Sequence, residues 1–176
     1  MTMQRKFFKL CLVGLGAALG LCACITPGKP KGPTASLRFH IQTNPDGSDR
    51  SAPIAIYRAN PMLLNVEKQP FLDERSITNA TVVDSLGSFA IQIQFDASGA
   101  KMLEQYSTSF RSRHCAIFSQ WGQKTMTNRW LAAPKFTRSI FNGTLVFTPD
   151  ATREESQAIV AALKNTVIQV QKSGEW

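Results

Sequence analysis

The hydrophobic pattern of residues 89–118 predicts a strand, a helix and a second strand in succession. Hydrophobic and polar residues alternate from Phe89 to Phe95, which is the period of a strand with one buried face. Asp96 and Ser98 then offer side-chain oxygens that can cap the start of a helix. Hydrophobic residues recur at steps of three and four along that helix, at Ala100, Leu103, Tyr106 and Phe110. A strand over 115–118 follows, and the unit as a whole predicts a helix packed on a sheet.

The remainder of the chain continues this alternation of strands and helices. Further strands are predicted over 37–41, 54–58 (returning as a hairpin on the first), 63–66, 77–84, 143–147 and 167–170. Residues 119–138 are loop-like or form a hairpin. Thr152 and Glu155 have the spacing of a capping box and begin a second helix, with Ile159, Ala162 and Leu163 on its buried side. The pattern predicts an α+β domain in which both helices cover one face of a mainly antiparallel sheet.

The first 24 residues predict an export signal. Arg5, Lys6 and Lys9 precede an apolar run from Leu10 to Leu21, which is shorter than the roughly 20 residues that span a bilayer. The run ends in Leu21-Cys22-Ala23-Cys24, which resembles the lipobox of bacterial lipoproteins. That resemblance implies removal of residues 1–23 and lipidation of Cys24. The alternatives are an ordinary signal peptide cleaved near Ala23 and an uncleaved anchor.

Removal of this signal changes the cysteine and charge balance of the chain. Cys11 and Cys22 leave with the signal and Cys24 is acylated, so Cys115 has no partner for an intrachain disulfide. Three basic residues also leave, which reduces the net charge from +8 to +5. Residues 24–36, rich in Pro, Gly and Lys, predict a flexible tether, and residues 37–176 have the length of one domain.

Short motifs between residues 52 and 163 resemble the head part of the first periplasmic domain of SecD and SecDF. The segment Phe95-Asp96-Ala97-Ser98-Gly99 is similar to that domain's F-x-x-x-G helix entry. Further matches are Ala133-Pro134, Ile140, Gly143, Phe147-Thr148, Glu154, Glu155, Ala158, Ile159 and Leu163. The resemblance implies a ferredoxin-like α+β module, and in that family the head is thought to contact exported polypeptide. No transmembrane helix is predicted here, so the family's proton-driven motor is not implied.

Few residues are candidates for catalysis or metal binding. His114 and Cys115 are adjacent on a predicted strand, so their side chains point to opposite faces and cannot form a catalytic pair. Cys115 is predicted to be a small buried residue, and His40 a solvated one on the polar side of its strand. No third ligand accompanies the two histidines, and no phosphate-binding loop, G-x-S-x-G, H-E-x-x-H or C-x-x-C motif is present. We therefore expect a non-enzymatic protein without a cofactor or metal.

One long stretch of the chain, residues 105–149, contains no acidic residue but many basic and aromatic ones. These residues are either core aromatics beside solvated charges, or a contact surface centred on 119–138. The candidate surface comprises Arg111, Arg113, Trp121, Lys124, Arg129, Trp130, Lys135, Phe136 and Arg138. Outside the cytoplasm its partners would be lipid headgroups, envelope polymers or a protein. Nucleic acid is not expected, because export removes the chain from it.

Together these features predict a lipid-anchored binding or scaffold protein on the periplasmic side of the cell envelope. Its partners would be the membrane, through the N-terminal lipid, and an envelope protein or polymer. Ile25 after the cysteine favours the outer membrane, by analogy with the sorting rule of enteric bacteria. Two alternatives stay open: an accessory factor in protein export or outer-membrane assembly, and an uncharacterised hydrolase or metal-binding protein.

Overall fold

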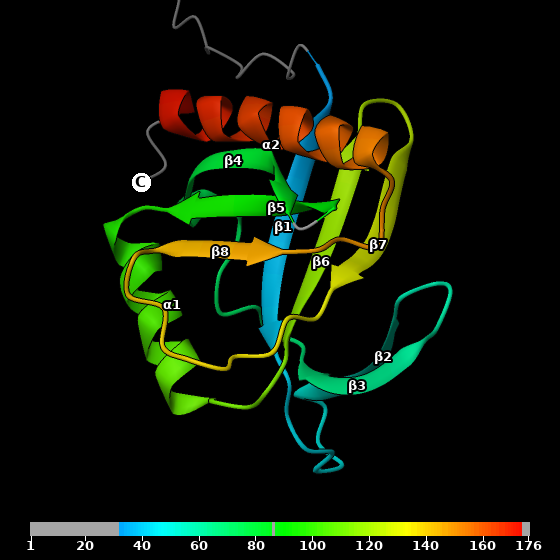
Figure 1. Cartoon of the computed structure of the whole chain (residues 1–176), viewed down its shortest axis with the longest axis vertical. Helices are drawn as coiled ribbons and strands as arrows, with labels where there is room; N and C mark the ends of the chain where they lie inside the picture. Colours follow the sequence, from blue (N-terminus) through cyan, green and yellow to red (C-terminus); the bar gives the residue numbers. More distant parts are fainter. Residues whose placement is uncertain (1–31, 86, 174–176) are drawn as a thin grey trace, which may run out of the picture.

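The computed structural model describes residues 32–85 and 87–173, so the predicted signal, Cys24 and most of the predicted tether lie outside the described residues. The described part of the chain is an α+β fold of antiparallel sheets and two α-helices, as the sequence predicts (Figure 1). The strands are β1 (Thr34–Ile41), β2 (Ser51–Ile56), β3 (Met62–Glu67), β4 (Ile77–Ser85), β5 (Ser88–Phe95), β6 (Cys115–Gly122), β7 (Met126–Ala132) and β8 (Thr144–Phe147). The helices are α1 (Ala97–Ser109), α2 (Arg153–Ser173) and the short 3-10 helix η1 (Glu74–Ser76).

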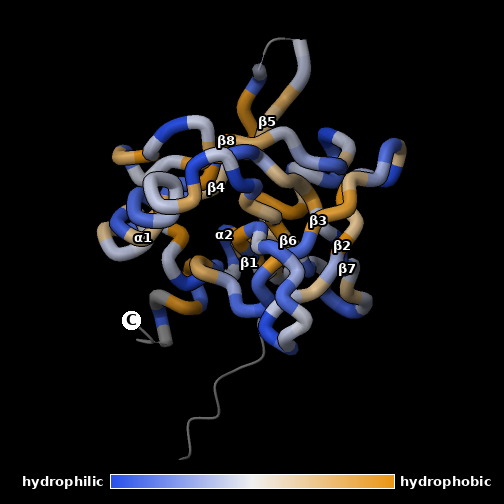
Figure 2. The backbone as a smooth tube through the Cα atoms, turned by 90° about the horizontal axis from the view of Figure 1, so that it is seen from below, coloured by the Kyte–Doolittle hydropathy of each residue, from blue (hydrophilic) through white to orange (hydrophobic). Residues whose placement is uncertain are grey.

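The strands of residues 32–85 and 87–173 are divided among three sheets, where the sequence pattern suggested one. Two three-stranded sheets, ordered β1-β6-β7 and β4-β5-β8, cross steeply in Figure 1 and pack against each other. Alternate residues of β1 and β5 point into the core between them, and the rings of Phe39 and Phe95 meet edge to face at 5.3 Å. Figure 2 shows the hydrophobic tracts of the strands toward the middle and hydrophilic turns at the periphery. The period-2 pattern identified the strands but could not identify which strands share a sheet.

Helix α2 covers the edges of both large sheets, because it packs against β1 and β4. The predicted capping box is confirmed: the N–H of Glu155 donates to Thr152 Oγ1 at 3.1 Å, and the N–H of Thr152 donates to Glu155 Oε2 at 2.9 Å. The strand predicted over 167–170 is wrong, because the helix continues through it to Ser173. Val167 follows Leu163 on the buried side of the helix, and this burial overrides the strand preference of β-branched residues.

Helix α1 begins and packs as its sequence predicts. The Asp96 carboxylate accepts a hydrogen bond from the N–H of Gly99 at 2.6 Å, and Leu103 is fully buried in the main core. Beside the helix, Gly143 leads into β8 with a φ of 63°, and a Cβ there would lie 2.7 Å from that of Ala100. Glycine is therefore required where β8 begins next to α1.

The hairpin of β2 and β3 covers the other face of the β1-β6-β7 sheet and encloses a second, smaller core. The prediction that the second strand returns on the first is wrong, because β2 pairs with β3 and β1 pairs with β6. The prediction of a solvated His40 is also wrong, because the hairpin of β2 and β3 covers this residue and leaves it 7% exposed. His40 Nδ1 lies 2.8 Å from the carbonyl oxygen of Glu67, and desolvation lowers the pKa of the imidazole.

The structure also decides where the first strand begins and what residues 119–138 form. Strand β1 begins at Thr34, so residues 34–36 belong to the sheet and not to the tether. The hairpin interpretation of residues 119–138 is correct, because β6 and β7 pair antiparallel. None of the helices in the part of the chain that the structure describes is both long and apolar enough to cross a membrane.

Candidate functional site

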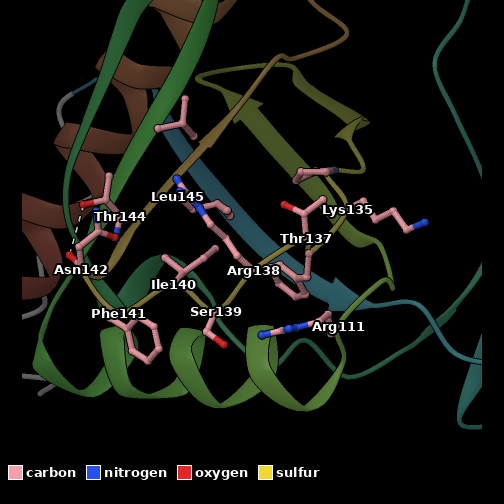
Figure 3. Close-up of a pocket in the computed structure, with 13 residues that line it drawn as sticks. Arg111, Lys135, Thr137, Arg138, Ser139, Ile140, Phe141, Asn142, Thr144 and Leu145 are labelled. Carbon is pink, nitrogen blue, oxygen red and sulfur yellow. Dashed lines mark hydrogen bonds between the residues drawn. The ribbon is translucent and has the colours of Figure 1, made fainter.

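An open groove of about 790 Å³ runs along β8, between this strand and the segment of residues 134–142 (Figure 3). Its lining includes the buried side chains of Phe136 and Leu145 and the partly buried Ile140. Phe141 and Val146, which are 73% and 47% exposed, also line it. The groove therefore combines an apolar floor with large apolar side chains that face water.

Hydrogen bonds hold the wall of the groove that faces β8. The N–H of Ser112 donates to the carbonyl of Phe136 at 2.7 Å, and the N–H of Phe136 donates to the carbonyl of Arg113 at 2.9 Å. Farther along, the N–H of Ile140 donates to Ser107 Oγ of α1 at 2.9 Å, and Thr108 bonds to Ser139 at 2.8 Å. The segment is thus fixed to α1 and to the start of β6, which keeps the groove open next to β8.

The charge of the groove is entirely positive. Arg111, Lys135 and Arg138 line it, all three are exposed, and no aspartate or glutamate is among its lining residues. None of the three forms an ion pair within the described residues. Unpaired cations around an apolar floor favour an occupant that carries carboxylate or another anionic group.

The structure separates the nine residues of the predicted contact surface. Only Arg111, Lys135 and Arg138 line the groove on its exposed side; Phe136 is 2% exposed and lies beneath it, so its place on the predicted surface is wrong. Phe136 is buried because residues 134–136 pair with 112–115 and turn its ring into the main core. The rest lie elsewhere: Trp121, Lys124, Arg129 and Trp130 on the β6–β7 hairpin, and Arg113 beside Gln42, whose carbonyl its guanidinium binds at 3.1 Å.

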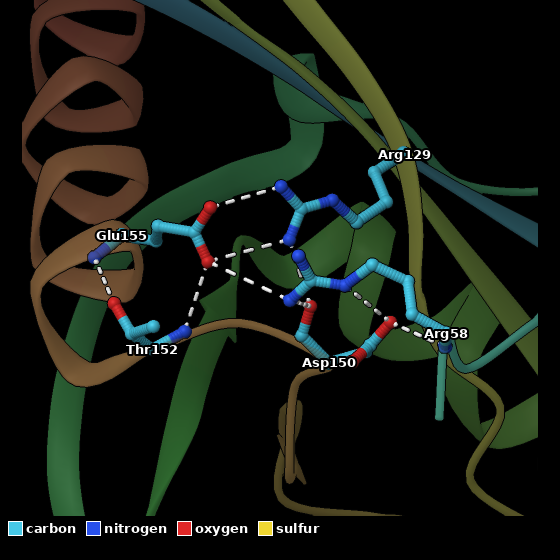
Figure 4. A network of polar contacts seen from close by, with 5 residues as sticks. All are labelled: Arg58, Arg129, Asp150, Thr152 and Glu155. Atoms are coloured by element: carbon cyan, nitrogen blue, oxygen red, sulfur yellow. Dashed lines mark hydrogen bonds and ion pairs between the residues drawn. The ribbon is translucent and has the colours of Figure 1, made fainter. Parts of the chain in front are cut away.

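Arg129 belongs to a polar network that joins β7, the start of α2 and the chain after β2 (Figure 4). Its guanidinium donates to both carboxylate oxygens of Glu155, at 2.9 and 3.3 Å, and to the carbonyl of Asp150 at 3.0 Å. Arg58 binds the Asp150 carboxylate at 3.2 Å. The hydrogen bond from Arg129, with that from the N–H of Thr152, lowers the pKa of Glu155 to about 2. Arg129 therefore connects elements of the fold and is not a free cation.

The candidate catalytic residues are placed as the sequence predicts, except for His40. Cys115 is fully buried in the main core, and this burial raises the pKa of its thiol. His114 lies at the surface of the sheet, where its Nδ1 is 2.8 Å from Gln42 Oε1. Residues 32–85 and 87–173 contain no group of three or more His, Cys, Asp or Glu residues that could hold a metal ion.

Sequence reasoning missed Phe141 and Val146 as site residues. A signal for Val146 was available, because Leu145 and Phe147 take the buried positions of β8 and the residue between them must point outward. Phe141 precedes the turn at Asn142 and Gly143, a place where a large aromatic side chain finds little to pack against. The exposure of both residues depends on which elements surround β8, and this is a property of the tertiary structure.

No family model and no curated protein matches the sequence. Among solved structures, the chain is similar to SecDF, described as a membrane component that enhances protein export, with 17% identity and a TM-score of 0.52. That similarity covers 76% of this chain and 64% of the other. A second structure, of SecDF in a super-membrane-facing form, matches with 17% identity and a TM-score of 0.52, over 74% of this chain and 19% of that one. The chain thus spans less than two thirds of these proteins, and the resemblance to SecDF that the sequence motifs indicated is confirmed for the fold.

Proposed function

We propose that this protein is a non-enzymatic binding module of the cell envelope that contacts polypeptides during protein export. The observation that carries the proposal is the groove along β8, where exposed Phe141 and Val146 lie beside cations that form no ion pair in the described part of the chain. Exposed apolar side chains next to charged ones are typical of surfaces that bind other proteins. The fold shared with SecDF, a component that enhances protein export, supports the same process for this chain.

The proposal includes an anchor at the amino terminus. The lipobox-like sequence ending in Cys24 supports lipidation of this residue after removal of residues 1–23, and a position on the periplasmic side of the envelope. Ile25 after the cysteine favours the outer membrane, by analogy with the sorting rule of enteric bacteria. The tether between Cys24 and β1 would keep the domain within reach of the membrane. A lipid-anchored protein with an open groove can act as an accessory factor for chains that other components move.

A crosslinking experiment tests the contact with exported polypeptide. We expect a photoreactive amino acid in place of Phe141 to crosslink to newly exported chains, and these products to disappear during a chase. Ile168 of α2 is the matched control, because it is also a large exposed apolar residue, at 48%, but lies away from the groove. Identical products from both positions, or a single persistent product from position 141, would contradict the proposal, and the latter would indicate a static scaffold.

Metabolic labelling with a fatty acid tests the anchor. We expect the label on the wild-type protein to be lost in Cys24→Ser and kept in Cys115→Ala, because the Cys115 side chain is fully buried and cannot be the acceptor. The measurement is the label per amount of immunoprecipitated protein. Label that persists in Cys24→Ser would show that another group is acylated and that the lipobox interpretation is wrong.

A further inference from the structure

Strand β8 is an open edge of its sheet. The sheet order is β4-β5-β8, and among the described strands nothing pairs with the other side of β8. The N–H of Phe95 donates to the carbonyl of Gly143 at 2.9 Å, and the antiparallel register continues from this pair to Leu145 with Ile93 and Phe147 with Ile91. Because bonding alternates along an antiparallel strand, the backbone N–H and C=O groups of Thr144 and Val146 point away from β5.

These outward groups face the groove. Asn142 Oδ1 accepts a hydrogen bond from the N–H of Thr144 at 3.1 Å, so this donor is satisfied locally. Among the described residues, no side chain makes such a hydrogen bond to the backbone of Val146, and this residue lines the groove and is 47% exposed. Exposed strand edges are usually protected by a charge, a proline or a covering segment. Strand β8 contains neither a charge nor a proline, and residues 134–142 leave a groove where a covering segment would lie.

We propose that β8 accepts an extended segment of another polypeptide as a fourth strand of its sheet, a mode of contact that rests on the proposed function. The backbone groups at Val146 would pair with the added strand, whose alternate apolar side chains would pack on Phe136 and Ile140 in the groove floor. The occupant carries acidic residues, because Arg111, Lys135 and Arg138 line the groove and form no ion pair with an acidic group among the described residues. Recognition through the backbone requires that the bound segment be extended but places few requirements on its sequence. Many different chains would therefore bind.

The first experiment separates backbone pairing from side-chain contact. The probe is a fluorescent peptide of alternating valine and threonine with glutamate at both ends, titrated into the full-length protein in detergent and followed by anisotropy. Val146→Pro removes the outward N–H but no hydrogen bond to β5, whereas Val146→Thr keeps the N–H and the branched shape. We expect Val146→Pro to weaken binding about tenfold, as for the loss of one backbone hydrogen bond, and Val146→Thr to change it less than about threefold.

A modified peptide keeps the test decisive if Val146→Pro does not fold. We expect wild-type protein to lose at least about tenfold in affinity for the same peptide methylated at every backbone nitrogen, because that peptide has no N–H on either edge to donate to an edge strand. Equal affinity for the methylated and unmethylated peptides would overturn the inference, as would equal binding by the Pro and Thr variants when both fold. No binding of any peptide would also overturn it, whereas crosslinking from position 141 tests the proposed function separately.

A charge exchange tests the acidic character of the occupant. We expect Lys135→Glu combined with Arg138→Glu to weaken binding of the glutamate-ended peptide and to strengthen binding of the same peptide ended with lysine. Both residues are exposed and without an ion pair in the described structure, so the exchange should leave the fold intact. The same loss for both peptides would overturn the assignment of an acidic occupant.

Discussion

Replacing Phe39 with alanine should lower the free energy of unfolding by about 3–5 kcal/mol, the range for removing a buried phenylalanine side chain. Phe39 is fully buried between the two large sheets, and its ring meets those of Phe95 and Phe71 at 5.3 and 6.5 Å. Its N–H also donates to Leu72 and its carbonyl accepts from Phe71, which fixes the backbone around the resulting cavity. The surroundings can therefore collapse only in part, and the loss should be measurable by urea unfolding at neutral pH.

Phe141→Ala is the matched control for this prediction. It removes the same side chain from a position that is 73% exposed, so its effect on the free energy of unfolding should stay within about 0.5 kcal/mol. The same control separates stability from binding, because Phe141 lines the groove and its removal should affect the contact with polypeptide. A loss below about 1 kcal/mol for Phe39→Ala would show that the two sheets do not enclose a common core around this ring.

Replacing Glu155 with glutamine should destabilise the fold by about 1–2 kcal/mol at neutral pH. The shift of its pKa from 4.5 to about 2 corresponds to about 3 kcal/mol of favourable interaction. Its side chain is 33% exposed, so water screens part of this interaction. Glutamine keeps the length and the hydrogen-bonding reach needed for the capping box with Thr152, so the change mainly removes the charge that Arg129 binds.

The pH dependence of this effect has a definite sign. Because the folded state lowers the pKa of Glu155, its stabilising contribution is complete above pH 4.5 and is lost as the pH falls toward 2. The difference in unfolding free energy between wild type and Glu155→Gln should therefore shrink over this window. As a control at neutral pH, Asp49→Asn, which removes an exposed carboxylate that forms no ion pair among the described residues, should change the free energy of unfolding by less than about 0.5 kcal/mol. A difference that stays constant from pH 7 to pH 2 would contradict the role of the ion pair.

The sequence pattern predicted only part of the candidate site. Residues 105–149 contain no acidic residue, and three of their cations, Arg111, Lys135 and Arg138, line the groove. The pattern could not indicate that Arg129 forms an ion pair with Glu155, which follows it by 26 positions. It also could not distinguish Phe136, turned into the core, from Phe141, left in water.

The sequence alone determined the local structure of this protein. The strand alternation at 89–95, the Asp96 cap and the Thr152–Glu155 capping box all depend on residues within a few positions of each other, and all three are confirmed. Only the tertiary structure decided which strands share a sheet, that a hairpin buries His40, and that the chain around Val167 is helical. These outcomes depend on burial between segments far apart in the chain, and burial energies outweigh the small local preferences of individual residues. The open edge of β8 is also decided by the tertiary structure, because a strand has an open edge only where no other strand pairs with that side of it.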